Sequence, residues 1–162
     1  MTFDEFENFL LSSQCFDNHD VAWIDEDQKI HYHQQDDFYD YYAFFSKLLA
    51  EEKCTIKIEQ MERHYKKSDV TIHLFYNPVN GPSFPEHTDP MDVGIECTSG
   101  IKTLDIEGMP VALEAGDYID IPAGTPHQAI NSTKSVMLSY GFNDTETLNR
   151  IREDDRDLQP QL

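Results

Sequence analysis

The chain has 162 residues, of which 12 are lysine or arginine and 31 are aspartate or glutamate, giving a formal net charge of −19. This length fits one domain of ordinary size. The acidic balance excludes a nucleic-acid-binding surface and a surface for anionic membranes, since both need clustered basic side chains. No apolar run approaches the ~20 residues of a membrane span. A hydrophobic content of 39% excludes a disordered chain.

Three cysteines, Cys15, Cys54 and Cys97, are widely spaced and odd in number. Because they include no C-x-x-C pair, they predict free thiols rather than a disulfide framework. The first five residues are acidic and lack the basic start of a secretory signal peptide. We therefore expect a reducing compartment, the cytoplasm.

The N-terminal third of the chain predicts two helices and a hairpin. Residues 3–12 carry apolar side chains at helical spacing, with acidic residues between them. Residues 21–33 consist of two short apolar segments around an acidic centre, which is typical of a β-hairpin. A second helix is predicted to run to about residue 52, and either Asp36 or Asp37 can cap its start.

From Cys54 onward, apolar and polar residues alternate, which indicates β-strands. Turn-forming residues separate these segments every ~8–12 residues, as in sandwiches and barrels. The predicted strands are 54–58, 70–76, 92–98, 101–106, 110–113, 117–121, 127–131 and 135–142.

These patterns divide the chain into three parts. Residues 1–53 hold the helices and the hairpin, and residues 54–142 form the barrel. Residues 143–162 are a polar tail with one helical turn near 147–152. We expect a mainly β fold in which two N-terminal helices pack on an antiparallel barrel of about eight strands.

One histidine and one aspartate stand out as candidate metal ligands. His87 and Asp89 are two residues apart, so on a strand both side chains would leave the same face. A third ligand must come from elsewhere in the chain, and His127 is the candidate. Two histidines and one carboxylate are the ligand set of non-haem Fe(II) oxygenases, and zinc is the less favoured alternative.

The surroundings of His127 strengthen this prediction. Gly116, Pro122, Gly124, His127 and Asn131 fit the pattern G-x5-P-x-G-x2-H-x3-N at all its fixed positions. This segment resembles the second motif of the cupin superfamily. The resemblance implies a double-stranded β-helix, the jelly-roll cupin barrel, with a metal inside and the N-terminal helices packed outside.

The first cupin motif, G-x5-H-x-H-x3,4-E-x6-G, is matched by Gly81, His87 and Gly100. Asp89 replaces the second histidine, and the position of the glutamate falls at Val93 or Gly94, which cannot bind a metal. The resemblance therefore implies a cupin with three metal ligands, His87, Asp89 and His127, in place of four.

A cupin with this ligand set resembles the JmjC-type Fe(II)/2-oxoglutarate-dependent oxygenases. Residues 73–93 are similar to the iron-motif region of the small bacterial ribosomal-oxygenase group of cupin-like hydroxylases. In that family a lysine thirteen residues past the ligand aspartate binds the far carboxylate of 2-oxoglutarate. Lys102, in Gly100-Ile101-Lys102, has this spacing. The resemblance thus implies Fe(II), with 2-oxoglutarate and O2 as co-substrates.

The chain departs from that family at two further positions. Its members use an asparagine and a tyrosine, two residues apart on a strand, as polar partners of 2-oxoglutarate. Those positions are His73 and Phe75 here, and Phe75 cannot donate a hydrogen bond. Either Tyr76, Thr103 or Ser139 takes over this role, or 2-oxoglutarate is not the co-substrate.

The predicted function is an Fe(II)- and 2-oxoglutarate-dependent oxygenase that hydroxylates a protein side chain. The acidic surface would suit a basic protein partner. Two alternatives stay open: a metal-dependent cupin enzyme without 2-oxoglutarate, such as a small-molecule dioxygenase or isomerase, and a non-catalytic cupin that binds a ligand. The oligomeric state stays open, and a homodimer is one alternative, because cupins often dimerise through sheet edges.

Overall fold

The structure is a computed structural model, and it describes residues 1–142. The predicted polar tail and its helical turn lie outside these residues. Within residues 1–142, no helix combines the length and the apolar character that crossing a bilayer requires. The elements in chain order are α1 (Phe3–Leu10), α2 (Ser13–Asn18), β1 (Val21–Ile24), β2 (Ile30–Tyr32), α3 (Phe38–Glu51), β3 (Thr55–Ile58), α4 (Met61–His64), β4 (Val70–Asn77), β5 (Asp92–Ile106), β6 (Met109–Glu114), β7 (Tyr118–Ile121), β8 (His127–Ala129) and β9 (Ser135–Phe142).

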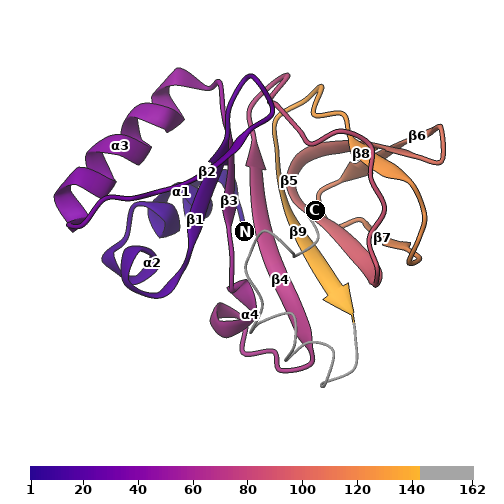
Figure 1. The fold of residues 1–162 in the computed structure, drawn as a ribbon, viewed down its shortest axis with the longest axis horizontal. Helices are drawn as coiled ribbons and strands as arrows, with labels where there is room; N and C mark the ends of the chain where they lie inside the picture. The colour runs from indigo at the N-terminus through magenta and orange to yellow at the C-terminus, as the bar shows by residue number, and fades with distance from the viewer. Residues whose placement is uncertain (143–162) are drawn as a thin grey trace.

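The strands form an antiparallel sheet in the order β2-β1-β3-β4-β9-β5-β6, with β7 and β8 also paired to β5. The long strand β5 closes the barrel. Its first half pairs with β9 and β7, whereas its second half pairs with β6 and β8. Figure 1 shows helices α1 to α3 on one side of the long strands β4 and β9, and β6 to β8 on the other. The mainly β fold with outer helices is confirmed.

The prediction of two separate strands at 92–98 and 101–106 is wrong, because β5 is continuous through Gly100. A register shift between Cys97 and Ser99 bends the strand there instead of ending it. Gly100 has a φ of +72°, and a Cβ at this position would lie 2.1 Å from the carbonyl oxygen of Lys134. Glycine is therefore required by the bend as well as by the close approach of the neighbouring backbone.

Local signals explain the helices. Thr2 and Glu5 form a capping box at the start of α1, with two reciprocal hydrogen bonds of 3.1 Å. The predicted helix 3–12 is too long, because Ser12 accepts a hydrogen bond from the backbone of Cys15 and starts α2, which the sequence reading missed. The short helix α4 was also missed. Asp37 caps α3 as predicted.

Two hydrophobic cores lie on opposite faces of the same strands. Along β4, Leu74 and Tyr76 pack against the helices, whereas Phe75 points into the barrel and packs with residues of β5 and β9. This alternation follows from the pleat of the strand. It confirms the expectation that the helices cover one face of the sheet. The barrel interior is thereby left for a second core and for the polar residues described below.

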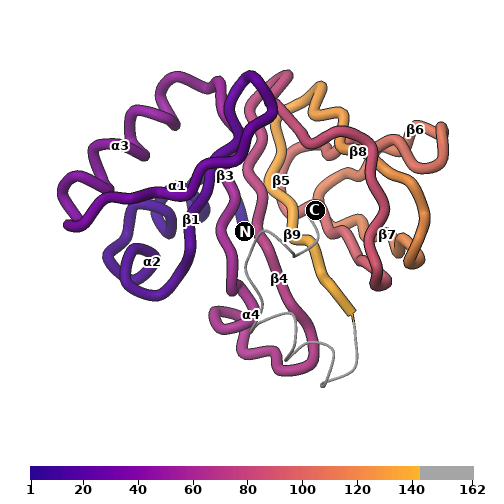
Figure 2. Tube along the Cα trace, viewed as in Figure 1, coloured from indigo at the N-terminus to yellow at the C-terminus, as the bar shows by residue number. Residues whose placement is uncertain are grey.

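The connection between β4 and β5 positions the candidate ligands. Figure 2 shows the chain leaving β4, crossing to the barrel side and passing next to β8 before it enters β5. An isolated pair of backbone contacts between His87 and His127 holds this connection against β8.

Candidate metal centre and adjoining pocket

The three candidate ligands come from two segments joined by backbone hydrogen bonds. His87 and His127 exchange a reciprocal pair of N–H···O=C bonds of 3.0 Å each. The backbone N–H of Gly124 donates to the carbonyl of Asp89 at 3.0 Å. His87 and Asp89 were expected on a strand, but they lie in the connection before β5. Their side chains still converge, because the β8 segment fixes the backbone at both residues.

Both histidine rings are held in one orientation. Nδ1 of His87 lies 2.9 Å from the carbonyl oxygen of Pro85, and Nδ1 of His127 lies 2.8 Å from that of Thr125. A carbonyl oxygen can only accept a hydrogen bond, so each Nδ1 carries a proton and donates it. Each Nε2 is then the nitrogen that presents a lone pair to a metal in the neutral ring.

The side chains of His87, Asp89 and His127 meet at one point, where their ligand atoms lie within 4.8 Å of one another. Nε2 of His127 is 3.1 Å from Oδ2 of Asp89. Both Nε2 atoms and both carboxylate oxygens are buried and make no hydrogen bond. Buried polar atoms rarely stay unsatisfied. A divalent metal would satisfy all three side chains, so the donor set fits such an ion.

The charge at this point also favours a cation. Burial lowers the pKa of His127, but the Asp89 carboxylate and the Thr125 carbonyl raise it more, so the net shift of the pKa is upward. The negative charge of Asp89 thus favours positive charge beside it. A metal ion supplies that charge without protonating the histidine.

Lys102 lies deep in the barrel, with only 1% of its surface exposed. Its Nζ donates hydrogen bonds to Oδ1 of Asn77 at 2.8 Å and to Oδ1 of Asn131 at 2.6 Å. Within residues 1–142 it forms no ion pair with a carboxylate. Burial therefore lowers the pKa of Lys102 from 10.5 to about 7.

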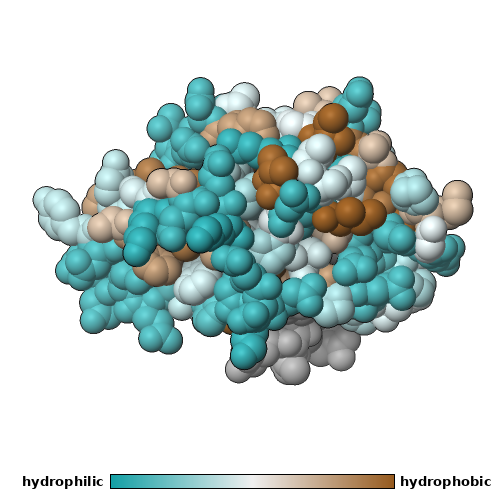
Figure 3. Space-filling model, turned by 90° about the horizontal axis from the view of Figure 1, so that it is seen from above, coloured by the Kyte–Doolittle hydropathy of each residue, from teal (hydrophilic) through white to brown (hydrophobic). Residues whose placement is uncertain are grey.

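His87 and Lys102 line the same pocket, a narrow cavity of about 20 Å³. The other lining residues come from the upper ends of the strands and from the connections above them: Ile24, Thr55, Phe75, Asn77, Pro82, Ser83, Phe84, Ala129, Asn131 and Met137. Figure 3, seen from above, shows hydrophobic side chains gathered over the barrel half of this face. A candidate metal ligand and a buried amine thus share one largely apolar pocket.

The structure separates the predicted co-substrate residues by strand face. Phe75 lines the pocket, and His73 and Ser139 lie opposite each other in the β4–β9 register, on the same face as Phe75. Tyr76 is on the other face, where its ring stacks on Phe6 at 4.8 Å. Thr103 follows buried Lys102 and turns outward to the hydroxyl of Ser132. Tyr76 and Thr103, two of the residues expected as alternative partners of 2-oxoglutarate, therefore point away from the pocket.

Three polar residues of the pocket were missed by the sequence reading: Thr55, Asn77 and Asn131. Nδ2 of Asn77 donates to Oγ1 of Thr55 at 2.9 Å, and Oγ1 of Thr55 donates to the carbonyl of Pro82 at 2.6 Å. Nδ2 of Asn131 donates to the carbonyls of Gly81 and Pro82 at 3.2 Å. These bonds aim both amide oxygens at Lys102. Asn131 had a sequence signal, since it is the last fixed position of the second motif.

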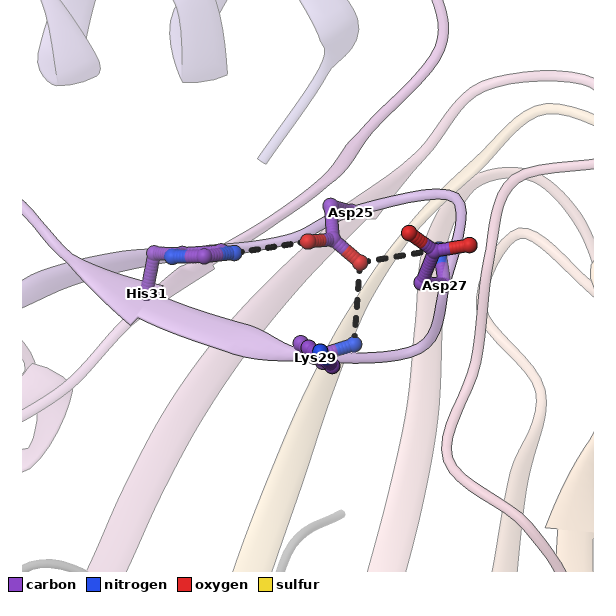
Figure 4. A network of polar contacts seen from close by, with 4 residues as sticks. All are labelled: Asp25, Asp27, Lys29 and His31. Carbon is purple, nitrogen blue, oxygen red and sulfur yellow. Dashed lines mark hydrogen bonds and ion pairs between the residues drawn. The ribbon is translucent and has the colours of Figure 1, made fainter.

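A second polar cluster sits at the tip of the β1–β2 hairpin (Figure 4). Oδ1 of Asp25 accepts backbone hydrogen bonds from Asp27 and Lys29, and Oδ2 of Asp25 lies 2.7 Å from Nε2 of His31. These contacts close a turn, which is a structural role. From the same tip, Gln28 donates to the carbonyl of Ser83 at 2.8 Å and so fixes the rim of the pocket.

Comparisons with known proteins agree with this architecture. Residues 74–140 match the family model described as Cupin domain. These residues include the barrel strands, two of the candidate ligands on one connection and the third on β8. These residues are therefore similar to a cupin domain, and the barrel has the cupin fold.

Two solved structures of one protein, both with TM-scores above 0.6, show the same fold. YcfD, a ribosomal oxygenase from Escherichia coli solved with cobalt and succinic acid, aligns with a TM-score of 0.64 and 16% identity over 98% of this chain and 49% of that one. The same protein with cobalt and 2-oxoglutarate aligns with a TM-score of 0.62, 18% identity and the same coverage. An RmlC-like cupin from Shewanella frigidimarina aligns more weakly, with a TM-score of 0.46 and 12% identity over 58% of this chain and 80% of that one.

This chain spans about half the length of the ribosomal oxygenase. At these identities the likeness establishes a shared fold. No curated protein sequence matches the chain significantly.

Proposed function

We propose that this protein is an Fe(II)- and 2-oxoglutarate-dependent oxygenase in which His87, Asp89 and His127 hold the metal. One observation carries the proposal: the ligand atoms of these side chains converge within 4.8 Å, and apart from the 3.1 Å contact between His127 and Asp89 their four buried polar atoms have no polar partner. Two histidines and one carboxylate are the ligand set of non-haem Fe(II) oxygenases and leave the remaining coordination positions open. Bound iron would supply the activation of O2 that such enzymes use.

The pocket supports a dicarboxylate as the co-substrate. Lys102 is a buried amine with two amide partners and no carboxylate partner within residues 1–142. An incoming carboxylate would supply the missing negative charge and favour the ammonium form. His87 and Lys102 line one pocket, which places the amine and a candidate metal ligand around the same space. In the YcfD structures the ligands are cobalt together with 2-oxoglutarate or succinic acid.

The proposed reaction balances without a further reactant. One O2 oxidises 2-oxoglutarate to succinate and CO2 and converts one substrate C–H bond into C–OH. The residues of this chain contribute binding and orientation. Asn77 and Asn131 position the Lys102 amine, and apolar Phe75 and Met137 help to keep water out of the pocket.

We propose a basic protein as the substrate and the cytoplasm as the location. The ribosomal oxygenase of the same fold supports a protein substrate, and the net charge of −19 would attract basic polypeptides. Hydrophobic side chains gather over the barrel half of the upper face, which offers an apolar approach (Figure 3). The three cysteines are free thiols, which suits a reducing compartment.

Turnover of 2-oxoglutarate tests this function. The full chain supplied with Fe(II), 2-oxoglutarate and O2 should form succinate, and His87→Ala should abolish it. His31→Ala is the matched control, because His31 contacts Asp25 at the hairpin tip and not the pocket. Equal succinate formation by the wild-type chain and by His87→Ala would rule out the proposal.

One observation favours a second candidate, a metal-dependent cupin enzyme that does not use 2-oxoglutarate. Phe75 lines the pocket at a position where the related oxygenases carry a hydrogen-bonding residue. Lys102→Ala separates the two functions. If the protein is a 2-oxoglutarate-dependent oxygenase, this substitution should abolish 2-oxoglutarate binding. If it is a cupin enzyme without 2-oxoglutarate, activity on a small molecule should stay largely intact. Failure to bind Fe(II) or Mn(II) at all would instead favour a non-catalytic cupin.

A further inference from the structure

A groove lies on the outer face of the sheet, away from the metal centre. Val93 and Ile95 of β5 point into the barrel core, so Gly94 and Glu96 between them face outward. The groove has a volume of about 240 Å³. It is lined by Lys67, Val70, Glu96, Tyr118, Tyr140 and Phe142.

Three aromatic rings form a row along this groove. Tyr118 lies across β5 at Gly94, where a Cβ atom would be only 2.0 Å from the tyrosine hydroxyl oxygen. The ring centroids of Tyr118 and Tyr140 are 6.2 Å apart, and those of Tyr140 and Phe142 are 6.0 Å apart with nearly parallel planes. Tyr118 is 46% exposed and Phe142 is 40% exposed. Gly94 is therefore needed for the row, and the row presents ring surface to solvent.

Both tyrosine hydroxyls bind carboxylates. The Tyr140 hydroxyl donates to Oε1 of Glu96 at 2.7 Å, and the Tyr118 hydroxyl donates to Oδ1 of Asp120 at 2.7 Å. Each carboxylate is held beside an aromatic ring while it keeps lone pairs for a further donor. Lys67 at one end is the basic side chain of the groove, so the groove with Asp120 carries a formal charge of −1.

We propose that this groove is a docking site for an arginine side chain of a basic polypeptide partner. A guanidinium group stacks on aromatic faces and donates to carboxylates in the same plane, which the rings and Glu96 offer together. The partner is basic because the groove is negative within a chain of net charge −19. A second copy of this chain would bring the same negative charge and is disfavoured.

A pair of peptides tests the proposal on the full chain without added metal, so its outcome is separate from that of the oxygenase function. One peptide alternates arginine with glycine and serine, and the other carries neutral citrulline at each arginine position. Titrations followed by ¹H–¹⁵N spectra should shift the amide signals of Gly94 and Glu96. The citrulline peptide should bind at least about tenfold more weakly. Equal binding of both peptides, or no binding of the arginine peptide, overturns the proposal.

Matched variants localise the effect. Phe142→Leu keeps an apolar side chain but removes the ring, and Glu96→Gln keeps the acceptor for Tyr140 but removes the charge. Each substitution should weaken binding of the arginine peptide several-fold. Tyr39→Leu is the control, because Tyr39 is 85% exposed on α3, near the acidic start of that helix and outside the groove. If Tyr39→Leu lowered the affinity for the arginine peptide as much as Phe142→Leu, the peptide would be attracted to exposed aromatic rings in general. This result would also overturn the proposal.

Discussion

Within residues 1–142, Lys57 and Lys102 are both fully buried, and their partners differ. Lys57 of β3 pairs with Glu59, with 3.1 Å between Nζ and Oε2. The same carboxylate oxygen accepts a hydrogen bond from the hydroxyl of Tyr32 at 2.7 Å. Lys102 of β5 is bound by two neutral amides, and no carboxylate within residues 1–142 pairs with it.

The difference separates a structural role from a binding role. A buried charge is costly unless an opposite charge accompanies it. Lys57 has its counter-ion, the Glu59 carboxylate, within the fold. Lys102 lies in a pocket with a candidate metal ligand, and burial lowers its pKa to about 7. An anionic ligand would supply Lys102 with a counter-ion. The Lys102 site can therefore bind an anion, whereas the Lys57 site already has its carboxylate.

The largest expected effect is on stability. Lys57→Met leaves the buried Glu59 carboxylate without its lysine and should lower the free energy of unfolding by about 3–5 kcal/mol. Lys102→Met removes a poorly solvated amine and should cost no more than about 2 kcal/mol. Urea denaturation followed by circular dichroism measures both. Each variant is the control of the other. Equal losses of the free energy of unfolding in the two variants would contradict the different roles assigned to the two lysines.

The next effect is a pH dependence of stability. The ordinary pKa of lysine, 10.5, applies to the unfolded chain, whereas burial lowers the pKa of Lys102 to about 7. Between these values the unfolded state binds a proton that the folded state does not. The free energy of unfolding should therefore rise with pH, by up to about 1.4 kcal/mol per pH unit. In Lys102→Met the rise of the free energy of unfolding with pH that comes from Lys102 should vanish. An unchanged pH slope in this variant would contradict the prediction.

A smaller effect comes from giving Lys102 a counter-ion. Asn131→Asp places a carboxylate where the amide oxygen now lies 2.6 Å from Nζ, so the site should become a closed pair like Lys57 and Glu59. The affinity for 2-oxoglutarate, measured by calorimetry, should fall by about tenfold or more. Binding of Co(II) should stay unchanged.

The control for this prediction is Asn80→Asp. Asn80 is exposed on a neighbouring part of the same upper face and does not contact Lys102. It adds the same charge without pairing with the amine, so it should change the affinity for 2-oxoglutarate by less than about twofold. A similar loss in both variants would point to general repulsion of the anion.

The smallest effect concerns the hairpin that links the two regions. β1 pairs with β3, which carries Lys57, and Gln28 at the hairpin tip donates to the carbonyl of Ser83 at the pocket rim. Gln28→Ala removes this exposed hydrogen bond and should lower the free energy of unfolding by about 0.5–1.5 kcal/mol. The thermal midpoint measures it. A larger loss than in Lys57→Met would mean that the rim, and not the buried pair, holds this part of the fold.

Local sequence patterns predicted most strands and the outer helices, because side-chain alternation and capping residues act within a few positions. The continuity of β5 could not be predicted in this way. Ser99 and Gly100 look like a turn in sequence, and only pairing with β9 and close contact with Lys134 make them a bend within a strand. Helix α2 is six residues long, too short for a periodic pattern.

The candidate site divides in the same manner. Motif spacing singled out His87, Asp89 and His127, and the fold brings these side chains together. The partners of Lys102 were missed, because their roles arise from the meeting of strand ends far apart in the chain. Tyr76 and Thr103 could have been rejected from sequence alone. Each adjoins a residue assigned to the barrel interior, and neighbouring residues on a strand face opposite sides.

The central claim is that the metal centre and the Lys102 pocket form one binding site. Calorimetric titration of 2-oxoglutarate into the full chain, with and without Co(II), tests it most directly. The affinity should be at least about tenfold higher with the metal, and by linkage 2-oxoglutarate should raise the affinity for Co(II) by the same factor. Equal affinities with and without Co(II) would contradict the claim, because the two sites would then bind their ligands independently.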